Sequence, residues 1–578
     1  MARSSAVAGS AHLQMLRWVV LAVALSLRLT EYLRNDSVWG DEAMLALNIA
    51  SRSFQELLQP LAYGQVAPVP FLWAERLMVT LFGVNEWALR ALPLIVGCVL
   101  CVAVALVARR MLRAQEALVA LVLVAFSHTL IRYSAEVKPY SLDAFLAVAT
   151  VGATARQLER MNDWRRWSLL AAAGAVAILF SLPSVFVCLG VGLALVTQAL
   201  QEKRANLLGR IALLGLIWGG LFTATYARFY RRAAGAPYMR SFWEGAFLVP
   251  GSPDLLGRAR VALQEVMWSL DSGMALLGLG AVTAAFILLG AITVWRRGQP
   301  GYVLLLLVPG LAPLAASAYG AYPIATRLML FASPLFLIMA AVGIMVAARA
   351  AHRLAPGVPA RWLAALLVLP AIITALTWAV SLKSDQQILP LLQDLNSRWR
   401  RGDAIYVYHR IVPAWLFYST DWAALNTQQL AWAMRISGPG ELGHENGPTR
   451  GPRPRGEGTE LVYDLRGRRI LLGTSSGVQG RPMFGYLPRQ PDSGWAVNET
   501  QRMRGAADPR IWIVLGNSSH DGLDLGTILL HAVSQQGGSL TYRDSLSGMA
   551  LYQFEFAADS VFRDRDRRSA PRISKSRP

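Results

Sequence analysis

The sequence contains little charge and almost no cysteine. Only 16% of its 578 residues are Asp, Glu, Lys or Arg, 54% are hydrophobic, and the mean hydropathy is +0.37. A soluble core does not need so many apolar residues, so the composition indicates a polytopic membrane protein. The three cysteines, Cys98, Cys101 and Cys188, all lie in apolar runs, which excludes a disulfide framework in the polar segments. Cys98 and Cys101 also lack the neighbouring His or acidic ligands that a closed zinc site needs.

Acidic residues are scarcer than basic ones, 36 against 56, which gives a net charge of +20. In a soluble protein this balance would suggest nucleic acid. Here many basic residues fall in short loops between apolar runs or in the polar tail, so we expect contacts with membrane lipids and no nucleic-acid partner.

Eleven apolar runs have about the 20 residues that a membrane-spanning helix needs. We therefore expect an all-α membrane bundle of about eleven transmembrane helices. The first run has no small-x-small cleavage site and ten further runs follow it, so it is expected to be an uncleaved helix rather than a signal peptide. The runs are 14–32, 87–108, 114–131, 140–158, 167–182, 184–200, 208–228, 273–295, 301–319, 328–347 and 362–381.

Basic residues in the short loops alternate along the chain, and cytoplasmic loops carry the excess of Lys and Arg. Residues 33–86, 132–139, 229–272, 320–327 and everything after about 382 are therefore predicted to face outward, in a plasma membrane of the bacterial inner-membrane type. The basic loop residues are Arg109, Arg110, Arg113, Arg156, Arg160, Arg165, Arg166, Lys203, Arg204, Arg210, Arg296, Arg297, Arg349, Arg353 and Arg361.

The composition changes after residue 382, which predicts a membrane domain over 1–382 and an extracytoplasmic α/β domain over 383–562. The pattern predicts helices at 388–400 and 523–535 and strands at 404–408, 510–515 and 550–556, and an α/β sandwich is the natural arrangement. Residues 438–458 are expected to be a flexible loop, and the basic, serine-rich residues 563–578 a disordered tail.

Asp41 and Glu42 are adjacent acids that directly follow the first apolar run. A charge at the edge of the hydrocarbon costs up to roughly 3 kcal/mol, so acids placed there are candidates for function. They open the first of two predicted interfacial helices, 41–58 and 70–82, which a turn at 63–68 separates. Asp41 could also serve only to stabilise the helix N-terminus that follows it.

The next outward turn, 132–140, contains seven polar groups at the mouth of two spans. Lys138 or Arg132 can neutralise a phosphate, and Glu136 can orient the cation. The hydroxyls of Tyr133 and Tyr140 can donate to phosphate or sugar oxygens. Structural roles remain open, because Glu136 could simply pair with Lys138 and the tyrosines could be interfacial anchors.

A third element, Tyr322, Pro323 and Arg327, lies outside the tenth run, and Arg327 is a second candidate phosphate ligand. Over about residues 15–350 the motifs resemble the type C glycosyltransferases, specifically the family 39-like branch of protein O-mannosyltransferases and lipid A aminoarabinose transferases. The residues that carry the resemblance are Trp39, Gly40, Asp41 and Glu42; the turn 65–70 with Glu86, Arg90 and Pro93; Tyr133, Glu136, Lys138 and Tyr140; and 322–327.

The resemblance implies that a hexose or pentose moves from a polyprenyl-phosphate donor to a lipid, glycan or protein acceptor outside the membrane, with inversion at the anomeric carbon. It makes Asp41 the general base and Glu42 a group that orients Asp41 or the acceptor. Lys138 and Arg327 would hold the departing phosphate. The donor site would be shaped by Arg132, Tyr133, Glu136 and Tyr140. Some type C enzymes use a divalent metal, so one beside Asp41 and Glu42 is an option, although this branch works without it.

Two other classes of protein would also place ionisable residues at span ends. A lipid or solute transporter or flippase does so, but such proteins usually have midplane sites and paired halves, and no internal repeat is visible here. The other class is a catalytically idle membrane scaffold that presents its outer domain. Mutation of Asp41 separates these alternatives from the enzyme.

Overall fold

The computed structural model describes residues 2–556 except 253, 271–279, 381–386, 426, 438–468, 473–492, 507–509, 517–524 and 547. The loop predicted at 438–458 and the tail predicted at 563–578 lie outside the described residues. The chain divides into two compact units. One is a helical bundle of residues 1–35 and 44–383, and the other combines residues 36–43 with the described parts of the chain from 387 to 556.

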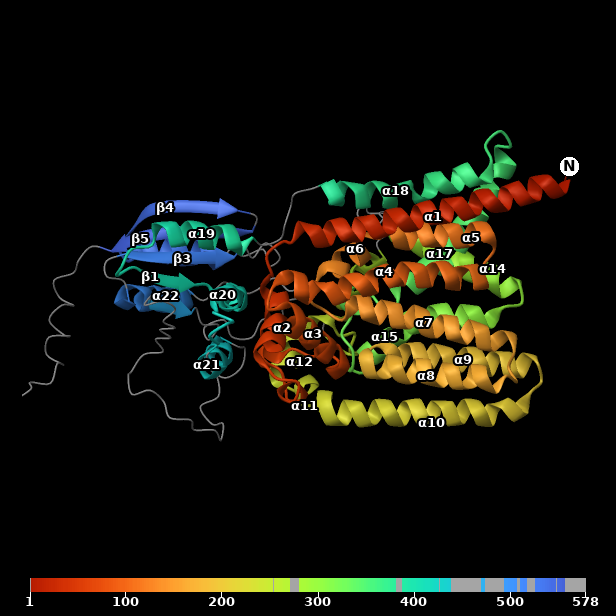
Figure 1. Ribbon diagram of the computed structural model, residues 1–578, viewed down its shortest axis with the longest axis horizontal. Coiled ribbons are helices and arrows are strands. Elements are labelled where there is room, and N and C mark those ends of the chain that lie inside the picture. The colour runs from red at the N-terminus through yellow and green to blue at the C-terminus, as the bar shows by residue number, and fades with distance from the viewer. Residues whose placement is uncertain are drawn as a thin grey trace, which may run out of the picture. The chain divides into compact units, whose positions relative to one another are not determined.

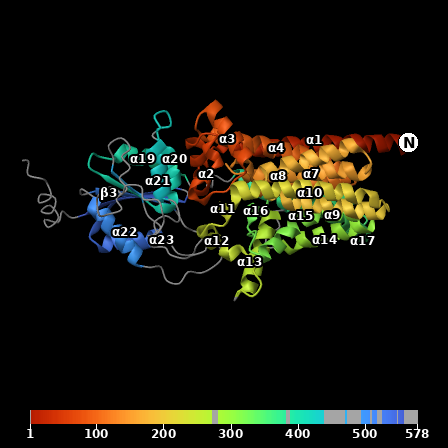
Figure 2. The ribbon, with the colours of Figure 1, turned by 90° about the horizontal axis from the view of Figure 1, so that it is seen from below.

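A helix lies at each of the eleven predicted spans, and Figures 1 and 2 show the long helices of the bundle side by side. Seven are long and apolar enough to cross a membrane, or eight if α5 and α6 form one bent span. The other three, α7, α8 and α14, fall short in length or apolarity, so the number of crossings stays a prediction. The helices are α1 (Ala2–Arg34), α4 (Glu86–Met111), α5 (Ala114–Ala125), α6 (His128–Arg132), α7 (Tyr140–Glu159), α8 (Trp164–Phe180), α9 (Ser184–Gln201), α10 (Leu208–Thr225), α14 (Gly280–Arg296), α15 (Pro300–Ala318), α17 (Ser333–Leu354) and α18 (Ala360–Val380).

Shorter helices connect these elements at one end of the bundle. The first outer loop forms α2 (Gly40–Ser51) and α3 (Val69–Phe82). The helix predicted to reach Leu58 instead ends at Ser51, because Ser53 donates from its N–H and its hydroxyl to the Glu56 carboxylate, both at 2.8 Å, and starts a separate turn. The remaining short helices are α11 (Arg231–Ala234), α12 (Pro237–Trp243), α13 (Leu255–Leu270) and α16 (Thr326–Met329).

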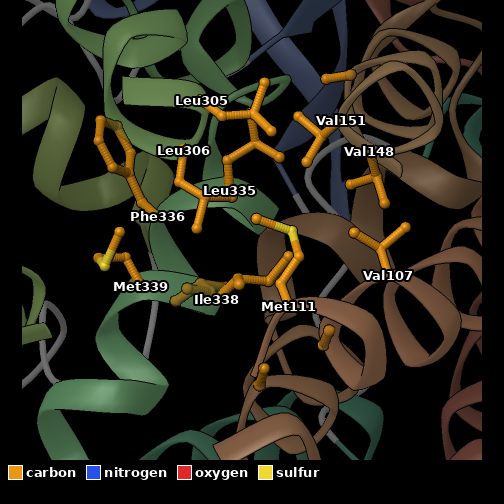
Figure 3. Packing of buried hydrophobic residues seen from close by; sticks show 14 of the residues in the cluster. Val107, Met111, Val148, Val151, Leu305, Leu306, Leu335, Phe336, Ile338 and Met339 are labelled. Carbon is orange, nitrogen blue, oxygen red and sulfur yellow. The ribbon is translucent and has the colours of Figure 1, made fainter. Parts of the chain in front are cut away.

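The bundle core is apolar, and α17 lies at its centre. Residues 333–345 of α17 are all buried, and Figure 3 shows Leu335, Ile338 and Met339 packed near Leu305 of α15 and Met111 of α4. A helix that is apolar on all sides is expected when other helices surround it completely.

A buried arginine explains a break in the apolar run 114–131. The axes of α5 and the following helix differ by 57°, and such a break frees backbone carbonyls that hydrocarbon cannot satisfy. The fully buried Arg28 of α1 donates to the carbonyls of Val124 (3.2 Å) and Ala125 (3.3 Å). Arg28 therefore caps the broken helix from a different element.

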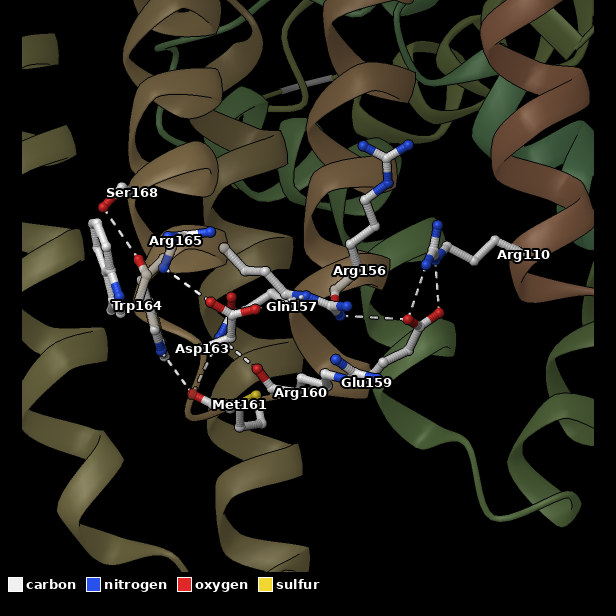
Figure 4. A network of polar contacts seen from close by, with 12 residues as sticks. Arg110, Arg156, Gln157, Glu159, Arg160, Met161, Asp163, Trp164, Arg165 and Ser168 are labelled. Carbon is white, nitrogen blue, oxygen red and sulfur yellow. Dashed lines mark hydrogen bonds and ion pairs between the residues drawn. The ribbon is translucent and has the colours of Figure 1, made fainter.

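Acids and arginines form a polar network at the C-terminal end of α7, far from its first residue, Tyr140. Glu159 accepts from Arg110 at 2.6 and 2.9 Å and from Arg166 at 3.4 Å (Figure 4). A polar cleft of about 780 Å³ lies beside it, lined by Glu159, Arg160, Met161, Asn162, Asp163, Glu202 and Arg204.

A buried acid ties three bundle helices together. Glu116, at the start of α5, accepts from Arg297 at 2.9 and 2.7 Å and from Arg349 at 3.2 Å. Arg297 follows α14 and Arg349 lies in α17. Several basic residues predicted to lie on one side of the membrane are therefore held by acids, the buried Glu116 and the exposed Glu159.

The second unit is built on a five-stranded sheet in the order β2-β1-β3-β5-β4. β1 (Ala404–Val407) lies parallel to β2 (Arg469–Leu472) and β3 (Arg510–Gly516), and β5 (Met549–Phe556) pairs antiparallel with β3 and with β4 (Gly538–Leu546). The predicted α/β class is confirmed, although β2 and β4 were not predicted.

Helices cover both faces of this sheet. Tyr406 of β1 donates to Glu499 of α22 (Ser493–Ala506) at 2.6 Å, and α22 packs on α23 (Leu525–Gln535). On the other face, Trp512 of β3 contacts the ring of Tyr542, whose hydroxyl donates to Asp394 of α19 (Ile388–Arg398) at 2.9 Å. Two further helices, α20 (Val412–Ser419) and α21 (Thr427–Ser437), follow β1.

Candidate functional site

The acid pair lies in the first turn of α2, where Asp41 is half-buried and Glu42 is fully buried. The partial positive charge of a helix N-terminus favours carboxylates at this position. The Ala43 N–H donates to the Trp39 carbonyl at 2.7 Å, so the helix begins within the Trp39–Glu42 motif. The acid pair is thus positioned by local sequence, and its backbone belongs to the same compact unit as the α/β sheet.

The outward turn that was predicted as a phosphate clamp is a buried polar cluster in the bundle. Lys138 is 5% exposed and its Nζ donates to Gln65 Oε1 at 2.8 Å. Gln65 belongs to the turn after α2, and its Nε2 lies 3.6 Å from Met44 Sδ on α2. The structure therefore joins Lys138 to the first outer loop, 73 residues earlier in the chain.

The neighbours of Lys138 on the same turn also contact one another. Glu136 is 5% exposed and lies 4.0 Å from the guanidinium of Arg132. The rings of Tyr133 and Tyr140 meet edge to face at 5.1 Å, and the Arg132 guanidinium lies 6.0 Å from the Tyr133 ring. Four of the predicted donor-site residues thus form one cluster on the turn that carries Lys138.

Close packing against α4 fixes the position of this turn. A Cβ atom placed on Gly97 of α4 would lie 2.5 Å from the Cβ of Ser134, a separation that real side chains do not adopt. Ser134 is fully buried, and its hydroxyl donates to the Ile131 carbonyl. Glycine at position 97 is therefore required for the turn to approach the helix.

Arg327 lies in a different set of contacts. Its guanidinium is 5.3 Å from the ring of Trp243, the buried last residue of α12. The preceding Thr326 is held by Glu265 of α13, which accepts from its N–H at 2.6 Å and its hydroxyl at 2.7 Å. The described contacts of Arg327 thus place it with the outer segment 229–272, and its predicted role beside Lys138 stays a prediction.

Sequence analysis missed Asp143, which lies in the first turn of α7, one turn after Lys138. It is 7% exposed, and its Oδ1 has no hydrogen-bond partner among the described residues. Burial raises the pKa of the Tyr322 phenol, and the nearby Asp143 carboxylate raises it further. An acid inside a predicted span was the signal that should have identified it.

The described residues offer little to a metal ion. No three His, Cys, Asp or Glu side chains come together anywhere in the parts of the chain that the structure describes. Asp41 and Glu42 alone provide fewer ligands than a protein-built divalent cation site usually has. We assign no role to a metal.

Residues 66–222 match the profile of a family described as dolichyl-phosphate-mannose-protein mannosyltransferase. The matched segment is roughly a quarter of the chain and includes Tyr133, Glu136 and Lys138, but it excludes Asp41 and Arg327. None of the curated proteins compared matches the chain.

Solved structures of membrane transferases are distantly similar. ArnT from Cupriavidus metallidurans bound to undecaprenyl phosphate is 12% identical, with 93% of this chain and 97% of that chain covered and a TM-score of 0.48. The archaeal oligosaccharyltransferase AglB from Archaeoglobus fulgidus, in complex with an inhibitory peptide and a dolichol-phosphate, is 12% identical, with 93% and 74% covered and a TM-score of 0.44. Its apo form is 13% identical, with 94% and 74% covered and a TM-score of 0.47.

Similarity to these structures is too low to transfer the role of any residue. The profile match, however, confirms the resemblance to the polytopic type C glycosyltransferases that the motifs predicted. The chain has several helices long and apolar enough to cross a membrane and an added α/β unit, and residues 66–222 carry its likeness to that family.

Proposed function

We propose that this protein transfers a sugar from a polyprenyl-phosphate carrier to a hydroxyl group of an acceptor at the extracytoplasmic face of the membrane. One observation carries the proposal. The segment that matches the mannosyltransferase family contains the buried Lys138 and Glu136 and the half-buried Tyr133, and these are groups suited to a phosphate and a sugar.

The phosphate end of the donor is assigned to Lys138, with Arg132 beside it. A buried ammonium forms charge-assisted hydrogen bonds that are roughly twice as strong as neutral ones. Its contact with Gln65 holds the Lys138 side chain in one place before the donor arrives. Arg327 is proposed as the second cation on the leaving phosphate, and Glu136, Tyr133 and Tyr140 as groups that contact the sugar.

Asp41 is proposed as the general base. The acceptor oxygen attacks the anomeric carbon and its proton passes to the Asp41 carboxylate. The bond between the anomeric carbon and the phosphate oxygen breaks, and its electron pair leaves with the polyprenyl phosphate. One displacement inverts the anomeric configuration, and phosphate is a good enough leaving group to need no second acid. Glu42 orients Asp41 or the acceptor.

One structural feature would also suit a flippase, because transporters often build their sites on broken helices. The break between α5 and α6 is of this kind. Its freed carbonyls, however, accept hydrogen bonds from Arg28, so they are satisfied within the protein rather than offered to a substrate. A flippase would also have no need of a base at Asp41.

The test uses the purified full-length protein with a panel of polyprenyl-phosphate hexoses and pentoses and a mixture of lipid, glycan and peptide acceptors. Release of free polyprenyl phosphate is followed by mass spectrometry, and donor binding is measured on the same samples. The variant is Asp41→Asn and the matched control is Glu56→Gln, which alters an acid in the same outer loop.

We expect release by the wild type and the control, and a loss of roughly 10²- to 10⁴-fold in Asp41→Asn, the usual contribution of a general base. Equal release by all three proteins would remove Asp41 from catalysis. Donor binding without release by any of them, across the whole panel, would favour a flippase or a scaffold.

A further inference from the structure

The acid pair is attached to the α/β unit by a short polypeptide segment, Asp36–Gly40. This segment belongs to the same compact unit as residues from the far end of the sequence. Its contacts come from three places in the α/β unit: the residue before α19, the end of α20, and the loop after β1.

Gln387, immediately before α19, makes the first contact. Its side-chain Nε2 donates to Asp36 Oδ1 at 2.8 Å, and its Oε1 accepts from the Ser37 hydroxyl at 3.1 Å. The Leu389 N–H donates to the same hydroxyl at 3.3 Å. One amide side chain therefore holds two consecutive residues, with the donor and the acceptor each used.

Tyr418, near the end of α20, makes the second contact. Its hydroxyl accepts from the Val38 N–H at 2.7 Å, and its ring packs edge to face on buried Phe417 at 5.2 Å. Val38 is fully buried, so its N–H would be left unsatisfied without this hydroxyl, a loss that costs about 1–3 kcal/mol in a typical protein.

The third contact is between backbones. A Cβ atom at Gly40 would lie 2.9 Å from the carbonyl oxygen of Arg410, so this position accommodates glycine only. Arg410 follows β1, and the Tyr408 N–H beside it donates to the Val514 carbonyl of β3. The contact is thus made at the carboxyl ends of the parallel strands, the edge where open α/β sheets usually hold their ligands.

Asp41 is the residue after Gly40, and Glu42 follows directly. The carboxylates are therefore attached to a backbone segment that the rest of the α/β unit contacts at four of its five residues, 36–38 and 40. We propose that Gln387, Tyr418 and the Arg410 backbone are positioning elements that fix the acid pair for the proposed transfer reaction. This inference rests on the proposed function, and it gives the α/β unit a role in the rate of transfer and none in holding the donor.

Positioning has a specific kinetic consequence. A displacement of about 1 Å at a reacting group can lower a rate by about 10²-fold, while binding of the donor phosphate, which is assigned to Lys138, would be unaffected. The prediction is a lower kcat at an unchanged KM for the donor.

The test compares Tyr418→Phe and Gln387→Ala with two matched controls in the same unit, Tyr552→Phe and Gln535→Ala, in the full-length protein. We expect kcat to fall about 10-fold in the first two variants and the donor KM to stay within twofold. Asp41→Glu, which moves the carboxylate by one methylene, should show a less than additive loss when combined with Tyr418→Phe. If Tyr418 had a purely structural role, its substitution would instead lower the fraction of active protein, and the losses of the two substitutions would add fully.

A second measurement does not depend on activity. Hydrogen exchange followed by mass spectrometry should show the peptide that contains residues 36–43 protected in the wild type and in Tyr552→Phe, and exchanging at least 10-fold faster in Tyr418→Phe. Wild-type transfer with unchanged kcat in both variants would overturn the positioning role and leave the proposed function standing. Faster exchange in Tyr418→Phe, with no transfer by any of the proteins, would instead contradict the proposed function and with it this positioning role.

Discussion

Asp403 should contribute strongly to the stability of the α/β unit. It precedes β1 and is 3% exposed. Its carboxylate accepts hydrogen bonds from Nε and Nη2 of Arg510, at 2.8 and 2.6 Å. The Trp512 indole and the Arg400 N–H also donate to it, both at 2.9 Å. Asp403→Ala leaves a half-buried guanidinium and two further donors without this acceptor.

Breaking a buried ion pair by removing one partner typically costs about 3–5 kcal/mol. We therefore expect Asp403→Ala to lower the free energy of unfolding of the α/β unit by about that amount. The control is Asp544→Ala, which removes a half-buried carboxylate that accepts from the Ser545 N–H at 2.8 Å and should cost less than about 1 kcal/mol. Urea-dependent hydrogen exchange of the β1 and β3 peptides measures the loss of unfolding free energy in each variant of the full-length protein.

The same carboxylate predicts a pH dependence. Burial pushes the pKa of Asp403 upward, but the hydrogen bonds from Arg510, Arg400 and Trp512 outweigh it and hold that pKa below its ordinary value. A lowered folded-state pKa means that the stabilisation is complete above the unfolded pKa of about 3.9 and is lost as the pH falls through the folded value. A wild type and an Asp403→Ala variant that differ by less than about 1 kcal/mol at pH 7 would refute the reasoning.

Three further substitutions test the bundle. Arg28→Met should destabilise the protein by about 2–5 kcal/mol in detergent melts, because two carbonyls at the break of α5 lose their donor; an unchanged melting temperature would contradict the capping role. Gly97→Val should push the turn at Ser134 away from α4 and raise the donor KM about 10-fold, whereas a normal KM would show that the turn does not bind donor. Asp143→Asn, beside Tyr322, should change the donor KM by roughly 10-fold without lowering the melting temperature if its buried carboxylate contacts the sugar.

Hydropathy was sufficient to place the bundle helices. The run predicted at 87–108 is the helix Glu86–Met111, because apolar length alone decides whether a segment is buried in a membrane bundle. The strand predicted at 510–515 is Arg510–Gly516 for a similar reason, since all its central residues are buried on both faces. β4 was missed because it is an edge strand with mostly exposed residues, which leaves no apolar alternation to detect.

The site depended on contacts that local patterns do not report. Lys138, Asp41 and Arg327 were identified from the types of their side chains and from motifs, but the Lys138–Gln65 bond joins residues 73 apart. The contact between Ser37 and Gln387 spans 350 residues and crosses the predicted domain boundary at 382. Only packing in three dimensions brings these groups together, so sequence periodicity could not reveal them.

The most direct test of the account is a single-turnover measurement with saturating donor and acceptor, comparing wild type with Asp41→Asn and Lys138→Met. Asp41→Asn should release polyprenyl phosphate at least about 100-fold more slowly while binding the donor as tightly as the wild type. Lys138→Met should bind the donor roughly 10- to 100-fold more weakly, because it lacks a charge-assisted bond to phosphate. Release by Asp41→Asn at the wild-type rate, with donor affinity unchanged in Lys138→Met, would contradict both assignments.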